Sequence, residues 1–284
     1  MPLVPMKGLL DKARAGRYAV GAFNCNNMEI IQAIIAAAEA EQSPVIVQAS
    51  QGAIKYAGID YIVAMTRLAA ESSRIPVALH LDHGTSYEQA RLCIDRGFSS
   101  VMVDGSKLSV ADNIALVNKV LADARPLGIT VEGELGKITG TEDDMFVSDK
   151  ESMYTEPEEA RYFVAQTGVD ALAVAIGTAH GQYKGVPKLD LERLEAIYQL
   201  VDTPIVLHGS SGVPDEAIRA AIARGVAKVN IDTNIREAFM AAAKAVITKN
   251  PDELDPRKML GPAREAATAI IRQKIQVFGS SGQA

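Results

Sequence analysis

The run Pro76–Gly84, PVALHLDHG, sets the pattern on which the predicted fold rests. An apolar segment as long as a β-strand ends at a histidine, and a glycine follows it. The same order recurs in Ala171–Gly181 (ALAVAIGTAHG) and in Thr203–Gly209 (TPIVLHG). Because the carboxyl ends of parallel strands meet at one rim of a sheet, three of the four histidines in the chain are expected to converge there.

The three histidines that end these runs form a candidate metal site. They are His83, His180 and His208. Neutral imidazole is the commonest protein ligand for zinc, and three protein ligands beside one open position describe a catalytic zinc site. The alternative is three unrelated loop histidines, each hydrogen-bonded to backbone. The recurrence of one local context at all three positions favours the metal site.

Short β-branched runs alternate with helical patterns along the chain, which is typical of βα units and a parallel sheet. The eight candidate strands are Tyr18–Phe23, Pro44–Gln48, Val77–Leu81, Ser100–Val103, Thr130–Glu134, Ala171–Ile176, Pro204–Leu207 and Ala227–Ile231. Helical periodicity separates them, for example over Met28–Glu41, Val110–Ala124, Pro157–Thr167, Leu191–Leu200 and Pro214–Arg224. Eight such units predict an α/β fold, a closed (β/α)8 TIM barrel. An open doubly wound sheet is less favoured, because no Gly-x-Gly-x-x-Gly follows an early strand.

The 284 residues fit a single barrel domain, residues 1–284, since α/β barrels often run to about 250 residues as one domain. Asp255–Phe278 predicts an additional C-terminal helix that packs on the barrel or on a partner subunit. Its expected apolar side carries Ala266, Ala269, Ile270 and Ile275. Two connections, Gly136–Tyr154 and Gly177–Lys188, are longer than a crossover requires. Both leave the rim where barrel active sites form, and their glycines predict lids.

The composition excludes several partners. A net charge of −6 and a pI near 5.4 give no field for nucleic acid or for an anionic membrane. The two cysteines, Cys25 and Cys93, are too few for a disulfide framework and indicate buried thiols in a reducing compartment. The N-terminus shows no charged leader before a long apolar region, and no run approaches eighteen apolar residues, so a cytoplasmic location is expected.

Carboxylates accompany the histidines at the predicted rim. Strand alternation places His80 and Asp82 on one face of HLDHG, with His83 just past the strand end. Asp82 is interpreted as a general acid/base, the alternative being support of a neighbouring imidazole, and His80 as an interior histidine. Asp104 and Glu134 end the next two strands. They could hold a second metal or accept hydrogen bonds from the ligand histidines, or they are a helix cap and a solvated carboxylate.

The last two strands are followed by HGSSG (His208–Gly212) and NIDTN (Asn230–Asn234), a place where barrels frequently bind phosphate. The hydroxyls available there belong to Ser210, Ser211 and Thr233. A glycine–serine loop alone is a weak signal, because ordinary turns use the same residues. Paired with the motif on the next strand, it indicates a phosphorylated substrate. Arg236 would reach a second phosphate, or it is an ordinary exposed helical arginine.

These groups together predict a reaction on a phosphorylated carbonyl compound. Zinc would polarise a ketone and stabilise the negative charge formed when the adjacent carbon loses a proton. A Schiff-base route would instead need a lysine at a strand end inside the barrel. Lys107 lies past the fourth strand in a solvated loop, and Lys228 lies inside the eighth strand without an evident access route. The metal route is therefore preferred.

The motifs HLDHG, VMVDGS, VEGELG, GTAHG, LHGSSGVP and KVNIDT occur in this order over the whole chain. In their order and spacing the chain resembles the class II, metal-dependent ketose-bisphosphate aldolases. The resemblance implies zinc on the three histidines and Asp82 as the group that gives the aldehyde oxygen its proton. It also implies a second or alternate metal position at Asp104 and Glu134. A monovalent cation (Na⁺ or K⁺) near the phosphate and a homodimer or homotetramer are further implications.

The resemblance assigns substrate contacts as well. Dihydroxyacetone phosphate would contact Gly181, Gly209, Ser210, Ser211, Asn230, Ile231, Asp232 and Thr233. Asn24 and Ser50, at the ends of the first two strands, match further substrate contacts. Glu142 in GTEDD matches a glutamate of the family's mobile loop. It is therefore the candidate base that removes the proton from dihydroxyacetone phosphate.

The opening and the ending of the chain resemble the fructose-1,6-bisphosphate branch, so reversible cleavage to dihydroxyacetone phosphate and glyceraldehyde 3-phosphate is expected. The tagatose-bisphosphate branch shares the zinc motif and is the alternative. Asp232 could bond a hydroxyl of the fructose isomer, where the tagatose branch often has an apolar residue. A barrel metallohydrolase is disfavoured, because YAVGAFN on the first strand carries no His-x-His pair. A non-catalytic sugar-phosphate-binding barrel is disfavoured by the intact Asp82 and histidines.

Overall fold

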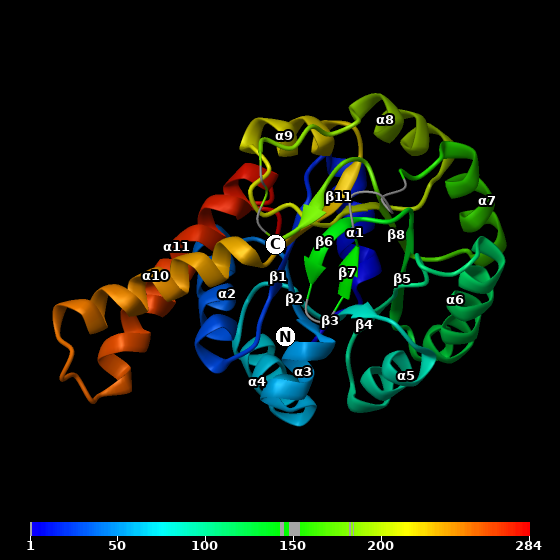
Figure 1. The fold of residues 1–284 in the computed structure, drawn as a ribbon. Coiled ribbons are helices and arrows are strands. Elements are labelled where there is room, and N and C mark those ends of the chain that lie inside the picture. The colour runs from blue at the N-terminus through cyan, green and yellow to red at the C-terminus, as the bar shows by residue number, and fades with distance from the viewer. Residues whose placement is uncertain (1, 143–144, 148–153, 182, 184) are drawn as a thin grey trace.

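A closed barrel of eight parallel strands forms the centre of the molecule (Figure 1). The computed structural model describes residues 2–142, 145–147, 154–181, 183 and 185–284, and only the backbone of 139–142 and 145–147. Around the barrel the strands follow the order β1-β11-β10-β8-β5-β4-β3-β2. Their bounds are β1 Val20–Asn24, β2 Val45–Ser50, β3 Val77–Gly84, β4 Ser100–Val103, β5 Thr130–Leu135, β8 Ala171–Val174, β10 Ile205–Leu207 and β11 Val226–Ile231. The predicted TIM barrel is confirmed, with every predicted strand within a few residues of its observed bounds.

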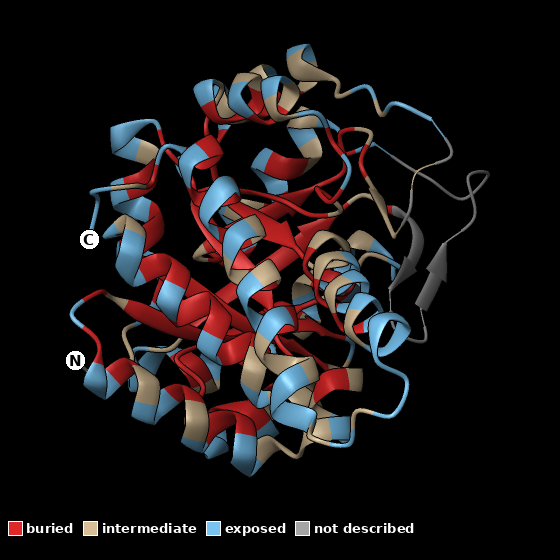
Figure 2. Cartoon of the chain, turned by 90° about the vertical axis from the view of Figure 1, so that its left-hand side faces the viewer, coloured by how far each residue is buried: buried red, intermediate tan, exposed pale blue. Residues whose placement is uncertain are grey.

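Helices surround the barrel and turn their exposed faces outward (Figure 2). They are α1 Met6–Gly16, α2 Met28–Glu41, α3 Gln51–Ala57, α4 Ile59–Ser72, α5 Tyr87–Arg96, α6 Val110–Ala124, α7 Pro157–Thr167, α8 Leu191–Leu200, α9 Asp215–Ala223, α10 Thr233–Lys249 and α11 Pro256–Phe278, with a short 3₁₀ turn at Arg125–Leu127. The outward side chains of the strands pack with these helices in the larger core cluster. Such two-sided burial explains why the strand sequences are apolar without alternation.

A smaller apolar cluster fills the inside of the barrel, and α1 contributes to it. The side chains Met6 and Leu10 of α1 are fully buried against inward residues of the strands. Several of those inward residues are alanines, namely Ala22, Ala78, Ala171, Ala173 and Ala227. Helix α1 was not predicted from the sequence. This apolar layer leaves the rest of the interior to the polar side chains described below.

The described parts of the two long connections pair in one small sheet. Its strands are β6 Thr139–Glu142, β7 Met145–Val147 and β9 Ala179–His180, in the order β7-β6-β9. Strand β6 runs parallel to β9, with Gly140 beside His180. The connection after β5 is therefore joined by backbone pairing to the connection that carries a candidate metal ligand.

The predicted C-terminal helix is present as α11, and it packs on α10 and α2. Of its predicted apolar side only Ile275 is buried, since Ala269 is exposed and Ala266 and Ile270 are partly buried. The buried stripe is Ala263, Ala267, Ile271, Ile275 and Phe278. The ring of Phe278 stacks on Phe23, with the centroids 6.4 Å apart, and this contact fixes which side faces the barrel. Among the described residues, no helix is long and apolar enough to cross a membrane.

Candidate metal centre and phosphate pocket

His83, His180 and His208 meet at the carboxyl rim of the barrel, and one ring nitrogen from each lies within 4.8 Å of the others. The Nε2 atom of His83 is 3.0 Å from the Nδ1 atom of His208. A tetrahedral ion with bonds of about 2.0–2.1 Å separates two ligand atoms by about 3.3 Å, so these nitrogens fit zinc. Burial lowers the pKa of His208, which keeps its imidazole neutral and able to bind a metal. The donor set is thus that of a three-histidine zinc site.

The backbone at His83 explains how this side chain reaches the rim. Strand alternation alone would send Asp82 and His83 to opposite faces of the sheet. The pairing of β3 with β4 shifts register between Leu81 and Gly84, and His83 has a φ of 51°. Such a bulge with a left-handed residue re-aims a side chain, at a cost of roughly 1–2 kcal/mol for a non-glycine residue. His83 was predicted to lie just past the strand end, whereas β3 continues through Gly84.

Asp104 and Glu134 lie on the other side of the His83 ring. The Nδ1 atom of His83 is 3.3 Å from Asp104 Oδ2 and 3.9 Å from Glu134 Oε2. Burial raises the pKa of Asp104, but the hydrogen bonds of His83 and Ser106 outweigh it and hold this pKa below its ordinary value. Asp104 therefore stays ionised and orients the imidazole with Nε2 toward the other histidines. His83, Asp104 and Glu134 also form a second group that could hold a metal.

The carboxylate of Asp82 is fully buried and held by three amide side chains. Its Oδ2 atom accepts hydrogen bonds from Asn24 Nδ2 at 2.8 Å and from Gln48 Nε2 at 3.1 Å. Its Oδ1 atom accepts one from Asn230 Nδ2 at 3.2 Å and lies 4.0 Å from His83 Nε2. The carboxylate is thus aimed at the metal centre in a fixed orientation. Gln48 was not predicted as a site residue, although an inward glutamine in an apolar strand was a readable signal.

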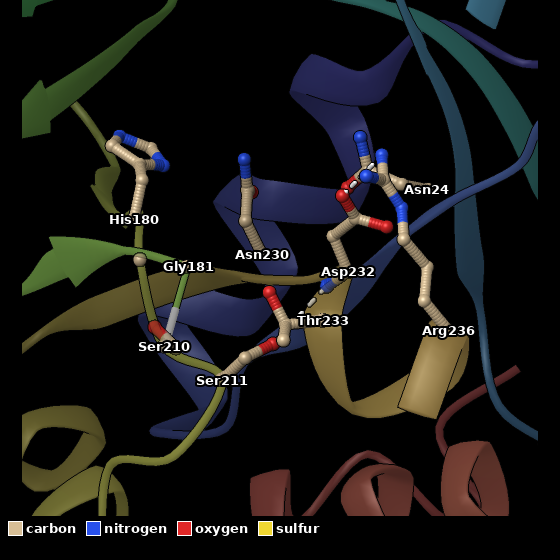
Figure 3. Close-up of a pocket in the computed structure, with 10 residues that line it drawn as sticks. Asn24, His180, Gly181, Ser210, Ser211, Asn230, Asp232, Thr233 and Arg236 are labelled. Atoms are coloured by element: carbon tan, nitrogen blue, oxygen red, sulfur yellow. Dashed lines mark hydrogen bonds and ion pairs between the residues drawn. The ribbon is translucent and has the colours of Figure 1, made fainter. Parts of the chain in front are cut away.

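A pocket beside the histidines is lined by the predicted phosphate-binding residues (Figure 3). Its lining is Asn24, His180, Gly181, Gly209, Ser210, Ser211, Asn230, Asp232, Thr233 and Arg236. Thr233 begins α10, so the positive end of a 17-residue helix faces this pocket. Arg236 forms an ion pair of 2.6 Å with Asp232 at the same helix end. The pocket therefore offers hydroxyls, a helix N-terminus and a guanidinium group to an anionic ligand.

Two predicted substrate contacts, Ser50 and Ile231, and the predicted base Glu142 are not part of this lining. The Ser50 hydroxyl caps α3 by accepting from Ala53 N at 3.3 Å, and Ser50 pairs in register with Asp82. The Ile231 side chain packs in the outer core and does not line the pocket. Glu142 ends β6, and its side chain lies outside the described part of the structure.

Tyr183 and Gly209 hold the strand that carries His180. The Tyr183 hydroxyl accepts a hydrogen bond from Ala179 N and donates one to Gly209 O, each 2.7 Å long. Burial raises the pKa of Tyr183 to about 12, so the phenol remains a donor at neutral pH. Tyr183 was not singled out from the sequence, because its partners are backbone atoms of a loop whose path no pattern reveals.

Replacing Gly209 by alanine is expected to weaken metal binding by at least about tenfold, as loss of ligand positioning does. A Cβ there would lie 2.6 Å from Ala179 O and 2.7 Å from Ala179 C, so the strand with His180 must move. The φ of 60° at Gly209 adds backbone strain. Competition with a fluorescent chelator measures the affinity. Gly185→Ala, in the connection that carries His180, is the control, because nothing lies within 4 Å of its Cβ. Equal affinity of the two variants would contradict this role of Gly209.

Comparison with known proteins agrees with the site. The sequence profile of the family described as Fructose-bisphosphate aldolase class-II matches residues 4–283. A protein named fructose-bisphosphate aldolase from Thermus caldophilus is 46% identical, over 97% of this chain and 98% of its own. One of the same name from Geobacillus stearothermophilus is 45% identical, over 100% and 99%. The crystal structure of the YdjI aldolase from Escherichia coli K12 matches with a TM-score of 0.87 at 33% identity, covering 99% of both chains.

Proposed function

The chain belongs to the class-II fructose-bisphosphate aldolase family, and from this premise we propose how its own residues carry out the reaction. The activity is the reversible cleavage of fructose 1,6-bisphosphate to dihydroxyacetone phosphate and glyceraldehyde 3-phosphate. The observation that carries the proposal is the convergence of His83, His180 and His208 beside the pocket. Zinc held by these imidazoles supplies Lewis-acid stabilisation of the charge that develops on the ketone oxygen.

Asp82 moves the proton at the C4 oxygen of the sugar. It accepts that proton during cleavage and returns it during condensation, as the two directions of one path require. The amides of Asn24, Gln48 and Asn230 hold its carboxylate in a fixed orientation for this transfer. Glu142 is proposed as the base that removes the proton from dihydroxyacetone phosphate in the condensation direction. Its match to the glutamate of the family's mobile loop supports this assignment.

The phosphate of the dihydroxyacetone half binds in the pocket of Figure 3. Gly181, Gly209, Ser210, Ser211 and Thr233 line the place where the N-terminus of α10 attracts an anion. Arg236 is proposed to bind the second phosphate. It lines this pocket and also a neighbouring one with Asn26, Asn27 and Tyr56, and this position between two pockets supports the assignment.

Class II aldolases are generally zinc-dependent, and we propose Zn²⁺ as the catalytic ion here. Asp104 and Glu134, with His83, are proposed as a second or alternate divalent position, and a monovalent cation (Na⁺ or K⁺) is proposed near the phosphate.

A homodimer or homotetramer is proposed. Exposed apolar side chains support it: Met240 and Ile247 on α10, and Leu254 in the connection between α10 and α11. Residues 1–284 are proposed as one domain and the cytoplasm as the location, which agrees with the free buried thiols of Cys25 and Cys93.

The purified enzyme is expected to cleave fructose 1,6-bisphosphate with a kcat/KM at least about a hundredfold above that for tagatose 1,6-bisphosphate. The two sugars differ in the configuration at C4, and a misplaced hydroxyl leaves buried polar groups unpaired. Asp232, in the pocket lining, is the proposed partner of the fructose hydroxyl. A coupled assay on both epimers, with zinc content measured on the same sample, tests this. Comparable turnover of the tagatose epimer would overturn the preference, and inactivity of zinc-loaded protein on both sugars would overturn the function.

A further inference from the structure

A fully buried group of polar side chains lies inside the barrel below the metal centre. It consists of His80, Glu132, His208 and Lys228, each 0% exposed. Glu132 joins the group, because its Oε1 atom is 2.8 Å from His208 Nε2 and its Oε2 atom is 2.9 Å from Lys228 Nζ. His80 bonds Ser100 Oγ through Nδ1 at 2.7 Å. Glu132 was not predicted as a site residue from the sequence.

The hydrogen-bond roles in this group follow from what each side chain can donate. An ammonium group only donates and an ionised carboxylate only accepts. Lys228 Nζ donates to Glu132 Oε2 at 2.9 Å in a fully buried ion pair, so the carboxylate is the accepting partner. His208 must therefore carry its proton on Nε2 and donate it to Glu132. In a neutral imidazole the other nitrogen, Nδ1, is then the lone-pair atom, and Nδ1 is the atom that faces His83 Nε2.

We infer that Glu132 is a positioning residue that fixes His208 in the tautomer able to bind the metal through Nδ1, and that Lys228 holds Glu132 in that role. A carboxylate behind a metal-bound histidine orients the ring and raises its basicity. Asp104 orients His83 in the same way, but it contacts Nδ1 of that ring, whereas Glu132 contacts Nε2 of His208. The inference rests on the proposed function only in taking His208 as a zinc ligand.

Glu132→Gln tests the inference with almost no change of volume. Glutamine has one acceptor oxygen, and Lys228, which can only donate, takes it. The amide NH₂ then faces His208 Nε2 and forces that atom to accept, so the proton moves to Nδ1, where a metal would bind. The variant is expected to bind zinc roughly tenfold to a hundredfold more weakly than the wild type.

The double variant Glu132→Gln/Lys228→Met distinguishes a change in the His208 tautomer from general disruption of the buried group. Without the lysine, the amide oxygen of the introduced glutamine is free to accept from His208 Nε2–H, so zinc affinity is expected to recover by most of the lost factor. The double variant also contains no uncompensated buried ammonium, which covers the case in which the single variant does not fold. Ser100→Ala is the matched control, because it disturbs the same buried group at His80 without touching Glu132.

Two measurements on metal-free protein give the readouts: zinc affinity by chelator competition, and ¹⁵N shifts of histidine-labelled protein at fixed pH. The chain has four histidines, and a His208→Gln sample assigns the signals of His208. The wild type, the control and the double variant are expected to show protonated Nε2 at His208, and Glu132→Gln protonated Nδ1. An unchanged tautomer, or undiminished affinity in a folded Glu132→Gln variant, would overturn the inference. Failure of the wild type to bind zinc would instead overturn the proposed function.

Discussion

Replacing Asp82 by alanine is expected to lower kcat by at least about a hundredfold, the usual loss for a general acid/base, while zinc stays bound. The carboxylate is held by Asn24, Gln48 and Asn230 and approaches His83 Nε2 no closer than 4.0 Å. Its removal therefore leaves the three histidines in place. Steady-state kinetics with zinc content measured on the same sample check both halves of this expectation.

Asp82→Asn is the companion variant of equal shape. It keeps the side chain in its place but cannot exchange a proton near neutral pH, so its kcat is expected to fall as far as that of the alanine variant. An asparagine variant with near wild-type kcat would show that Asp82 acts by shape. A wild-type kcat in Asp82→Ala would remove Asp82 from the mechanism altogether.

Removing the metal with EDTA is expected to lower the rate of cleavage by at least about a thousandfold, because the ion supplies several kcal/mol of charge stabilisation. Addition of Zn²⁺ is expected to restore the activity. Lys228, inside the described part of the barrel, cannot replace the ion by forming a Schiff base with the ketone. Its side chain is 0% exposed and pairs with Glu132 at 2.9 Å. Activity assays before and after chelation measure the effect.

Treatment with borohydride in the presence of substrate completes this test. Borohydride traps a Schiff base, so a lysine-dependent enzyme would be inactivated irreversibly. Unchanged activity after the reagent is removed is the expected result. Persistent activity in metal-free protein, or inactivation by borohydride, would each contradict the metal route.

Much of the fold was predictable because two-sided burial leaves apolar runs that periodicity detects. The bounds of α2, α6, α7 and α8 agree with the predicted ones, and β4 agrees to the residue. The convergence of His83 and His208 was predictable for the same reason, since each closes an apolar run at the same end of a parallel sheet. Eight predicted strands implied a closed barrel, and the carboxyl ends of the strands in such a barrel lie at one rim.

The remaining features depend on partners that a linear pattern does not contain. The left-handed bulge at His83 depends on the register between β3 and β4. The role of Glu132 depends on Lys228, 96 residues away, lying across the barrel interior. The alternation of Glu132 and Glu134 in an apolar strand was a readable pattern for two inward carboxylates, but it was not used, and it does not identify the histidine that each one contacts. The register of α11 likewise required the contact between Phe23 and Phe278.

The pairing of β6 with β9 has a consequence for how the ion and the sugar influence each other. His180 belongs to β9, and its neighbour across the ladder is Gly140 of β6, two residues before Glu142. A molecule that binds more tightly to one placement of β6 thereby favours one placement of His180. Thermodynamic reciprocity then requires that the ion changes the affinity for that molecule by the same factor as the molecule changes the affinity for the ion. Saturating sugar phosphate should accordingly change the zinc affinity, measured by chelator competition at equilibrium, by the same factor as saturating zinc changes the affinity for the sugar phosphate.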